Sequence, residues 1–242
     1  MTGTAPSEEA HVLTLPRRTP AGTRPSRLVN LRTRARPQRS AGTRQPASNG
    51  AMETTYRIRR AGPDDMEAVL RLYGSAADWL QKEKDTNQWA RPWPDRAAMN
   101  ARVAKGISDG LTWMVEDASA LVGTITCRER GTDYLWTPDE LRDPAVYVSR
   151  LIVSRGHAGQ GIGAALIDWA ADRAAREWQA NWIRVDVWTT NAGLHEYYKN
   201  QGFTHLRTKQ VATEWEYPSA ALFQKPTADI NRVAAARFKE AR

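Results

Sequence analysis

Cysteine is nearly absent from this sequence: Cys127 is the only one among 242 residues. A single thiol excludes an intramolecular disulfide and fits a reducing compartment. No apolar run approaches the length of a membrane span, and the N-terminal residues lack the apolar core of a signal peptide. We therefore expect a cytoplasmic protein with no membrane partner. The four histidines are scattered, without metal-ligand spacing, so no metal site is expected.

Lysine is absent from residues 1–51, although this segment holds most of the excess positive charge. It contains nine arginines and two glutamates, a charge of +7 out of the formal +8 of the chain. Large apolar residues are too few to offset the conformational entropy of the segment, so we predict a disordered extension. Nucleic acid is expected as a partner only through this Arg-rich arm. Met52 offers an alternative start of translation.

The patterned part of the chain begins at Met52, and all ten tryptophans lie at or beyond Trp79. We expect a single domain over residues 52–226 and a C-terminal tail over residues 227–242, with a loose helix at 228–242. The expected strands are residues 55–61, 111–116, 120–128, 145–153, 182–188, 203–207 and 213–224. The expected helices are residues 63–87, 95–105, 161–177 and 192–201, and residues 131–143 are expected to be a polar connection. Alternating strands and helices predict an α/β fold with a mixed central sheet flanked by helices.

Three glycines, Gly159, Gly161 and Gly163, separate the apolar strand 145–153 from a helix with an apolar stripe. Free N–H groups at such a helix N-terminus form a site for phosphate. The spacing formally matches a dinucleotide fingerprint, but the loop is long, and Asp186 lies inside the next strand instead of at its end. No Gly-Lys-Ser/Thr follows, which excludes a P-loop.

A second motif follows the loop: Asn191, Tyr198 seven residues later, and then Gly202-Phe203. Together with the glycine loop, it resembles the GNAT superfamily of acyl-CoA-dependent N-acyltransferases. The resemblance covers residues 147–206 well and extends over residues 55–224. One position departs from the family pattern, because Ala158 stands where Gln or Arg is usual. Arg155 could supply the lost charge.

The resemblance implies acetyl-CoA as the acyl-donor cosubstrate. Its pyrophosphate would bind the backbone of the loop that consists of Gly159, Gln160, Gly161, Ile162, Gly163 and Ala164. The pantetheine arm would pair with Leu151, Ile152 and Val153, in a slot opened by a splay between this strand and the next. Asn191 would contact the cosubstrate, and its alternative role is a helix cap.

The reaction implied by the family is direct attack of a primary amine on the thioester. Tyr198 would protonate the departing thiolate, and the N–H of Leu151 would polarise the carbonyl. Asp186 or solvent would take the amine proton, since an ordinary aspartate, with a pKa of about 4, is a poor base. The alternatives are a core role for Tyr198 and a solvent-facing strand position for Asp186. Cys127 is expected to be a buried filler.

The acceptor amine is expected between the first two helices and the last strands. Aromatic and polar residues gather there: Trp79, Gln88, Trp89, Trp93, Tyr134 and Trp136, with Glu214 and Glu216 opposite. Aromatic rings and two carboxylates would suit a cationic amine with an apolar body, although the tryptophans could instead fill the core. The favoured function is therefore an N-acetyltransferase that acts on a small-molecule amine. The alternatives are a protein or peptide N-acetyltransferase and a non-catalytic acyl-CoA sensor, and a homodimer is left open.

Overall fold

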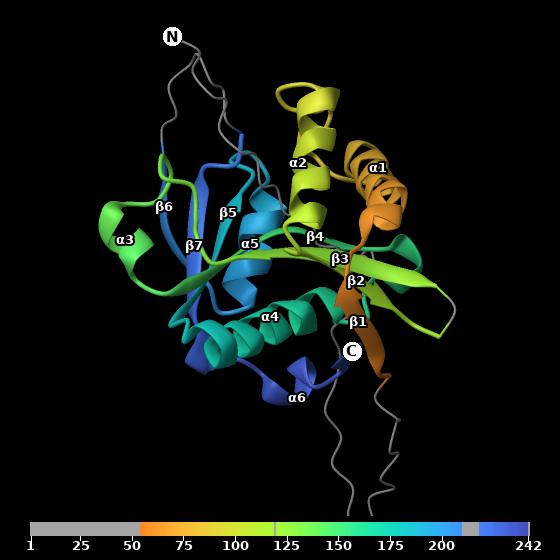
Figure 1. The fold of residues 1–242 in the computed structure, drawn as a ribbon. Helices are drawn as coiled ribbons and strands as arrows, with labels where there is room; N and C mark the ends of the chain where they lie inside the picture. Colours follow the sequence, from red (N-terminus) through yellow and green to blue (C-terminus); the bar gives the residue numbers. More distant parts are fainter. Residues whose placement is uncertain (1–53, 119, 210–217, 242) are drawn as a thin grey trace, which may run out of the picture. The chain divides into compact units, whose positions relative to one another are not determined.

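The computed structural model describes residues 54–118, 120–209 and 218–241. The expected arm over residues 1–51, the two carboxylates Glu214 and Glu216, and the start of the last expected strand lie outside the described residues. Within them, the chain forms a mixed sheet with helices on both faces (Figure 1). This confirms the α/β fold class predicted from the sequence.

The elements follow the expected order closely. The strands are β1 (Tyr56–Arg60), β2 (Thr112–Glu116), β3 (Leu121–Arg128), β4 (Ala145–Val153), β5 (Trp182–Val187), β6 (Thr204–Thr208), β7 (Ala221–Pro226) and β8 (Phe238–Glu240). The helices are α1 (Met66–Glu83), α2 (Arg96–Ser108), α3 (Pro138–Arg142), α4 (Ile162–Trp178), α5 (Ala192–Asn200) and α6 (Arg232–Ala235). Short 3₁₀ turns are η1 (Pro63–Asp65), η2 (Arg155–His157) and η3 (Thr227–Asp229).

The strand order in the sheet is β6-β7-β5-β4-β3-β2-β1-β8. The β4–β5 and β1–β8 pairs are parallel, and the other neighbours are antiparallel. The strands joined by short turns form hairpins, whereas α4 carries the chain from β4 to the parallel strand β5. The expected final antiparallel pair is confirmed as β6 and β7.

The two faces of the sheet are covered by different helices. Figure 1 shows α1 and α2 on one side and α4 and α6 on the other. The stripe expected on α4 is buried against the sheet at each position: Ile162, Leu166, Trp169, Ala170 and Ala174. On the opposite face, Ile152 of β4 packs with Leu72 and Tyr73 of α1. This sandwich fixes β4 between two apolar layers.

The polar connection expected over residues 131–143 contains a short helix, α3, that the sequence analysis did not predict. Thr137 caps this helix by accepting from the Glu140 N–H, and the Glu140 carboxylate accepts from the Thr137 N–H. Arg207 of β6 holds the same carboxylate through two hydrogen bonds of 2.7 Å. A local capping box and one arginine therefore stabilise a helix too short for a periodic signal.

The expected loose helix at 228–242 was wrong. Among the described residues of this range, the α-helix is limited to Arg232–Ala235, and β8 then joins the sheet as the parallel neighbour of β1. Phe238 is buried and its ring stacks on Tyr56 at a centroid distance of 5.8 Å. The sheet thus extends beyond the boundary at residue 226 that the sequence predicted.

We predict that Glu140→Gln destabilises the fold in a pH-dependent manner. The hydrogen bonds from Arg207 lower the pKa of Glu140 from 4.5 to about 2. A carboxylate with a depressed folded-state pKa stabilises the fold above its unfolded pKa, and this contribution disappears as pH falls toward about 2. Partial exposure limits the effect to about 1 kcal/mol.

Urea unfolding at pH 7, 5 and 3 measures the difference in the free energy of unfolding between the variant and wild type. This difference should be full at pH 7 and 5 and reduced at pH 3. The control is Glu67→Gln, whose exposed pair with Arg71 should contribute almost nothing. A pH-independent loss would contradict the prediction.

Candidate active site

The parallel strands β4 and β5 pair only at their beginnings. Three pairs form the ladder, Ala145 with Trp182, Val146 with Ile183 and Tyr147 with Arg184. Beyond them, β4 continues to Val153 and stays paired with β3 on its other side. The second half of β4 therefore has an edge that faces β5, and the backbone groups along this edge take no part in the β4–β5 ladder. This is the splay expected from the family resemblance.

The last pair of this ladder is held by a buried arginine. Arg184 is only 2% exposed. It donates to the Tyr147 hydroxyl at 2.9 Å and to the Glu140 carbonyl, and it lies 3.4 Å from the Asp143 carboxylate. These contacts join β5, β4 and α3 at the point where the two strands begin to separate.

A β-bulge in β4 lies next to the splay. Two pairs flank the bulge, Ser149 with Thr126 and Ile152 with Thr124. Between these pairs, β4 has two residues and β3 has one. Arg150 takes a left-handed backbone conformation, with φ 45°. Because Ser149 pairs with Thr126 and the Arg150 Nε donates to the Thr126 hydroxyl at 3.4 Å, both side chains lie on the α2 face.

Ser149 was not anticipated from the sequence. Its side chain is fully buried, and among the described residues its hydroxyl has no hydrogen-bond partner. Buried hydroxyls nearly always have a partner, so a lone one at the edge of a splay indicates a site for a ligand or water. A serine inside an apolar strand was the only available sequence signal.

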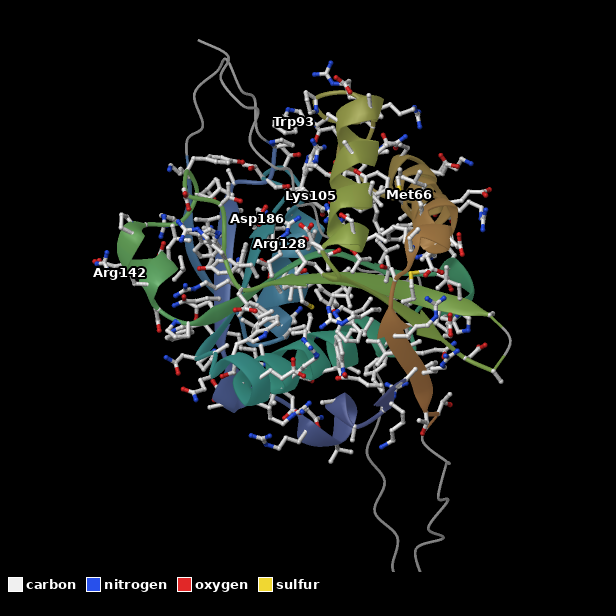
Figure 2. The ribbon with its side chains drawn as sticks, in the orientation of Figure 1. Met66, Trp93, Lys105, Arg128, Arg142 and Asp186 are labelled. Atoms are coloured by element: carbon white, nitrogen blue, oxygen red, sulfur yellow. The ribbon has the colours of Figure 1, made fainter. Side chains whose placement is uncertain are left out.

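Asp186 occupies the matching position on β5. It lies two residues beyond the last ladder pair, as Ser149 does on β4. Val185 and Val187 pack into the core on the α4 face, so Asp186 points to the opposite face, where α2 lies (Figure 2). It is 3% exposed, which rejects the alternative of a solvent-facing strand residue.

Tyr198 approaches the splay from α5. The side chain is completely buried, and its ring lies edge-on to Phe203 with centroids 5.1 Å apart. Desolvation, with smaller contributions from Tyr197 and the charge of Asp186, raises the pKa of Tyr198 well above 10. The hydroxyl therefore stays protonated at neutral pH and can act as a proton donor.

The glycine loop has the conformation that its composition suggested. Gly159 and Gly161 have φ of +79° and +70°, a region that side chains disfavour. Gly161 is the N-cap of α4 and makes no side-chain cap, whereas α2, α3 and α5 are capped by Asp95, Thr137 and Asn191. The first N–H groups of α4 therefore lack the side-chain partner that these other helices have.

A cavity of about 200 Å³ lies against this loop. It is lined by the predicted residues Val153, Gly159, Gly161, Ile162, Gly163 and Ala164, together with His157, Ala158, Tyr197 and Gln201. The predicted residue Gln160 does not line it, since its side chain accepts from the Tyr56 hydroxyl. His157 is held at 2.7 Å from the Ser154 hydroxyl and 3.0 Å from the Asp117 carboxylate.

The two remaining loop candidates are engaged elsewhere. The Arg155 guanidinium lies 4.1 Å above the ring of Trp79, so it packs on α1 instead of replacing the charge missing at Ala158. Asn191 caps α5 by accepting from the Leu194 N–H, and its amide donates to Gln88 at 2.6 Å. The structure thus supports the alternative of a helix cap for Asn191.

The residues expected around the acceptor divide into two groups. Gln88, Trp89 and Trp136 are buried, as the core alternative proposed. Trp79, Trp93 and Tyr134 are half-buried. The last two pack against the same apolar cluster around Leu135 and Trp136, next to the half of the sheet that holds β5 and β7.

Cys127 is buried, and burial raises the pKa of its thiol to about 12, which makes it unreactive at neutral pH. Over the described residues, no group of three His, Cys, Asp or Glu side chains could hold a metal ion. Nor does any described helix have the length and apolarity needed to cross a membrane.

Comparison with known proteins gives a consistent result. The model of the acetyltransferase (GNAT) family matches residues 74–203, more than half of the chain. A Bacillus subtilis (strain 168) protein, named as the uncharacterized N-acetyltransferase YesJ, is 26% identical over 163 residues, which is 62% of this chain and 88% of that protein.

Two solved structures share the fold. A GNAT-family acetyltransferase from Listeria monocytogenes 4b F2365 superposes with a TM-score of 0.57 at 26% identity, covering 71% of this chain and 94% of that one. The PaiA N-acetyltransferase from Thermoplasma acidophilum, solved in complex with coenzyme A, has a TM-score of 0.51 at 14% identity, covering 72% and 99%.

Proposed function

The chain belongs to the acetyltransferase (GNAT) family, and from this premise we propose that it transfers an acetyl group from acetyl-CoA to the primary amine of a small-molecule acceptor. The observation that carries the proposal is the separation of β4 and β5 after three ladder pairs, beside a glycine loop at the start of α4. The edge of β4 would bind an extended part of the ligand, and the start of α4 would bind an anionic group of the same ligand.

The residues at this path fit coenzyme A. The N–H groups of Ile162, Gly163 and Ala164 at the start of α4 would bind the pyrophosphate, where the helix dipole also favours negative charge. Leu151, Ile152 and Val153 would pair with the amides of the pantetheine arm along the part of β4 that lies beyond its ladder with β5. When bound, acetyl-CoA supplies an activated acetyl group. Gly159 and Gly161 leave the loop free of side chains where a phosphate must approach closely.

Two residues would supply donors to the thioester. Tyr198 keeps its proton at neutral pH, which suits the donation of a proton to the departing thiolate. Leu151 belongs to the bulge that the ladder with β3 skips, and its N–H would polarise the acetyl carbonyl.

Asp186 and Ser149 would handle the amine. Both lie two residues beyond the last β4–β5 pair on the α2 face. Asp186 would accept a proton from the ammonium group of the acceptor, directly or through one water, so that the neutral amine can attack the thioester carbonyl. Ser149, whose hydroxyl has no hydrogen-bond partner in the described structure, would orient the amine or that water.

We predict that Gly161→Ala weakens acetyl-CoA binding about tenfold, because a left-handed non-glycine residue costs roughly 1–2 kcal/mol. Calorimetric titration of the full chain with acetyl-CoA measures the effect. Gly156→Ala is the matched control. This glycine is in the same loop, lies outside the left-handed region and has open space around it, so the affinity of the variant for acetyl-CoA should match wild type. Absence of acetyl-CoA binding by the wild-type chain would overturn the proposed function.

Tyr198→Phe is expected to lower kcat about 100-fold while leaving the Kd for acetyl-CoA unchanged, since it removes only the proton donor. Tyr197→Phe makes the same change on the neighbouring ring, which lines the loop cavity, and should leave kcat near wild type. Release of free CoA in the presence of an amine panel reports turnover. Equal loss in both variants would assign Tyr198 a structural role.

Asp186→Asn is expected to reduce kcat/KM for the amine by roughly 10- to 100-fold at pH 7. The loss should shrink toward pH 9.5, because an amine with a pKa of about 10.4 then arrives increasingly deprotonated. A pH-rate profile at saturating acetyl-CoA measures this. A constant loss across the pH range would instead indicate a purely structural contribution of the carboxylate.

A further inference from the structure

Arg237, which lies between α6 and β8, contacts the glycine loop from a distant part of the chain. Its Nη1 donates to the Gln160 carbonyl at 3.4 Å. A Cβ atom at Gly161, the N-cap of α4, would lie 3.9 Å from the same nitrogen. The guanidinium therefore lies at the start of α4, next to a glycine that also lines the cavity beside the loop.

Tyr56 and the pairing of β8 determine where this arginine lies. The Tyr56 N–H donates to the Arg237 carbonyl at 2.8 Å, and Tyr56 pairs with Phe238 in the parallel ladder of β1 and β8. The guanidinium lies 5.4 Å from the centre of the Tyr56 ring. The Tyr56 hydroxyl donates to the Gln160 side chain at 3.3 Å, so one tyrosine contacts both the loop and the arginine. Packing on the sheet thus holds Arg237 against the loop.

The positive charge of Arg237 has no carboxylate partner among the described residues, and its buried Nε makes no hydrogen bond there. The acids on neighbouring elements pair with other cations. Asp172 of α4 lies 2.7 Å from Arg232, and Glu240 of β8 lies 3.6 Å from Arg173. The helix dipole disfavours a cation near a helix N-terminus and favours an anion. The start of α4 therefore combines a helix N-terminus with an arginine, and both favour a bound anion.

The cavity beside the loop has a weakly charged lining. Within the part of the chain that the structure describes, this lining includes no lysine or arginine. Ala158 stands where the family pattern has Gln or Arg, and Arg155 packs on Trp79. The phosphate groups of coenzyme A are anions whose geometry an arginine matches with paired hydrogen bonds. An arginine beside this cavity would supply the charge that its lining lacks.

We propose that Arg237 binds a phosphate group of coenzyme A at the start of α4. Its hydrogen bond to the Gln160 carbonyl is long, so the guanidinium can exchange it for a phosphate oxygen at little cost. This inference rests on the proposed use of acetyl-CoA and adds a binding residue from beyond residue 226, where the sequence placed the end of the domain. The diphosphate and the 3′-phosphate offer the same chemistry, and a cosubstrate without the 3′-phosphate separates them.

Calorimetric titration of the full chain with acetyl-CoA at about 0.05 M and about 0.5 M salt tests this role, because salt screens interactions between charges. Arg237→Gln should raise the Kd about tenfold at low salt and less than about threefold at high salt. Arg237→Lys keeps the charge and should recover most of the affinity. The matched control is Arg232→Gln, which removes an exposed charge from α6 and should bind acetyl-CoA like wild type.

Acetyl-3′-dephospho-CoA identifies the phosphate group. If Arg237 binds the 3′-phosphate, this compound should bind Arg237→Gln and wild type with equal affinity. If Arg237 binds the diphosphate, a difference of about tenfold should remain. Melting temperatures without cosubstrate, expected to match wild type, show that the fold is intact. Arg237→Met, which keeps an apolar chain against Tyr56, replaces the glutamine variant if that variant is unstable.

Equal affinity of Arg237→Gln and wild type for acetyl-CoA overturns the inference. A loss that does not depend on salt also overturns it, because the arginine would then only position Gln160. A loss of the same size in Arg232→Gln counts against it as well, since a general change in charge would explain both variants. Failure of the wild-type chain to bind acetyl-CoA is a separate outcome, which overturns the proposed function and with it this inference.

Discussion

The geometry of this molecule depends on where two parallel strands stop pairing. If β4 and β5 stayed paired to their ends, their backbone groups would satisfy one another and no edge would face a ligand. The pair of Tyr147 and Arg184 is the last, and the Arg184 guanidinium ties β5 to Tyr147 and to the α3 segment there. Helices on both faces hold β4 while its second half leaves β5. The separation is therefore built by packing on either side of it.

Polar groups that would be costly in an ordinary core gather at this separation. Ser149, Arg150 and Asp186 are all buried on the α2 face, and Tyr198 of α5 is buried as well. Burying charges and hydroxyls costs free energy unless partners satisfy them, so these residues distinguish this part of the molecule from an ordinary apolar core.

Much of this architecture could be predicted from the sequence, because its long helices and strands show a regular spacing of apolar residues. The bounds of β4 agree with the structure, and α4 with its glycine N-terminus lies within one residue of expectation. The elements missed were short: α3 depends on the Thr137–Glu140 capping box, and β8 depends on pairing with a distant strand. The bulge at Arg150 and the buried position of Ser149 follow from strand register and neighbouring elements. Such long-range contacts leave no local pattern in the sequence.

The parallel pairing of β8 with β1 joins two strands that stand far apart in the order of synthesis, the first and the last among the described residues. Until Phe238–Glu240 emerge, the outer edge of β1 has no neighbour, and its N–H and C=O groups remain open to other chains. During synthesis the nascent domain therefore carries an unprotected sheet edge until β8 has emerged and paired with β1. Ribosome-bound chains that stall before β8 would be the form of this protein most prone to aggregate.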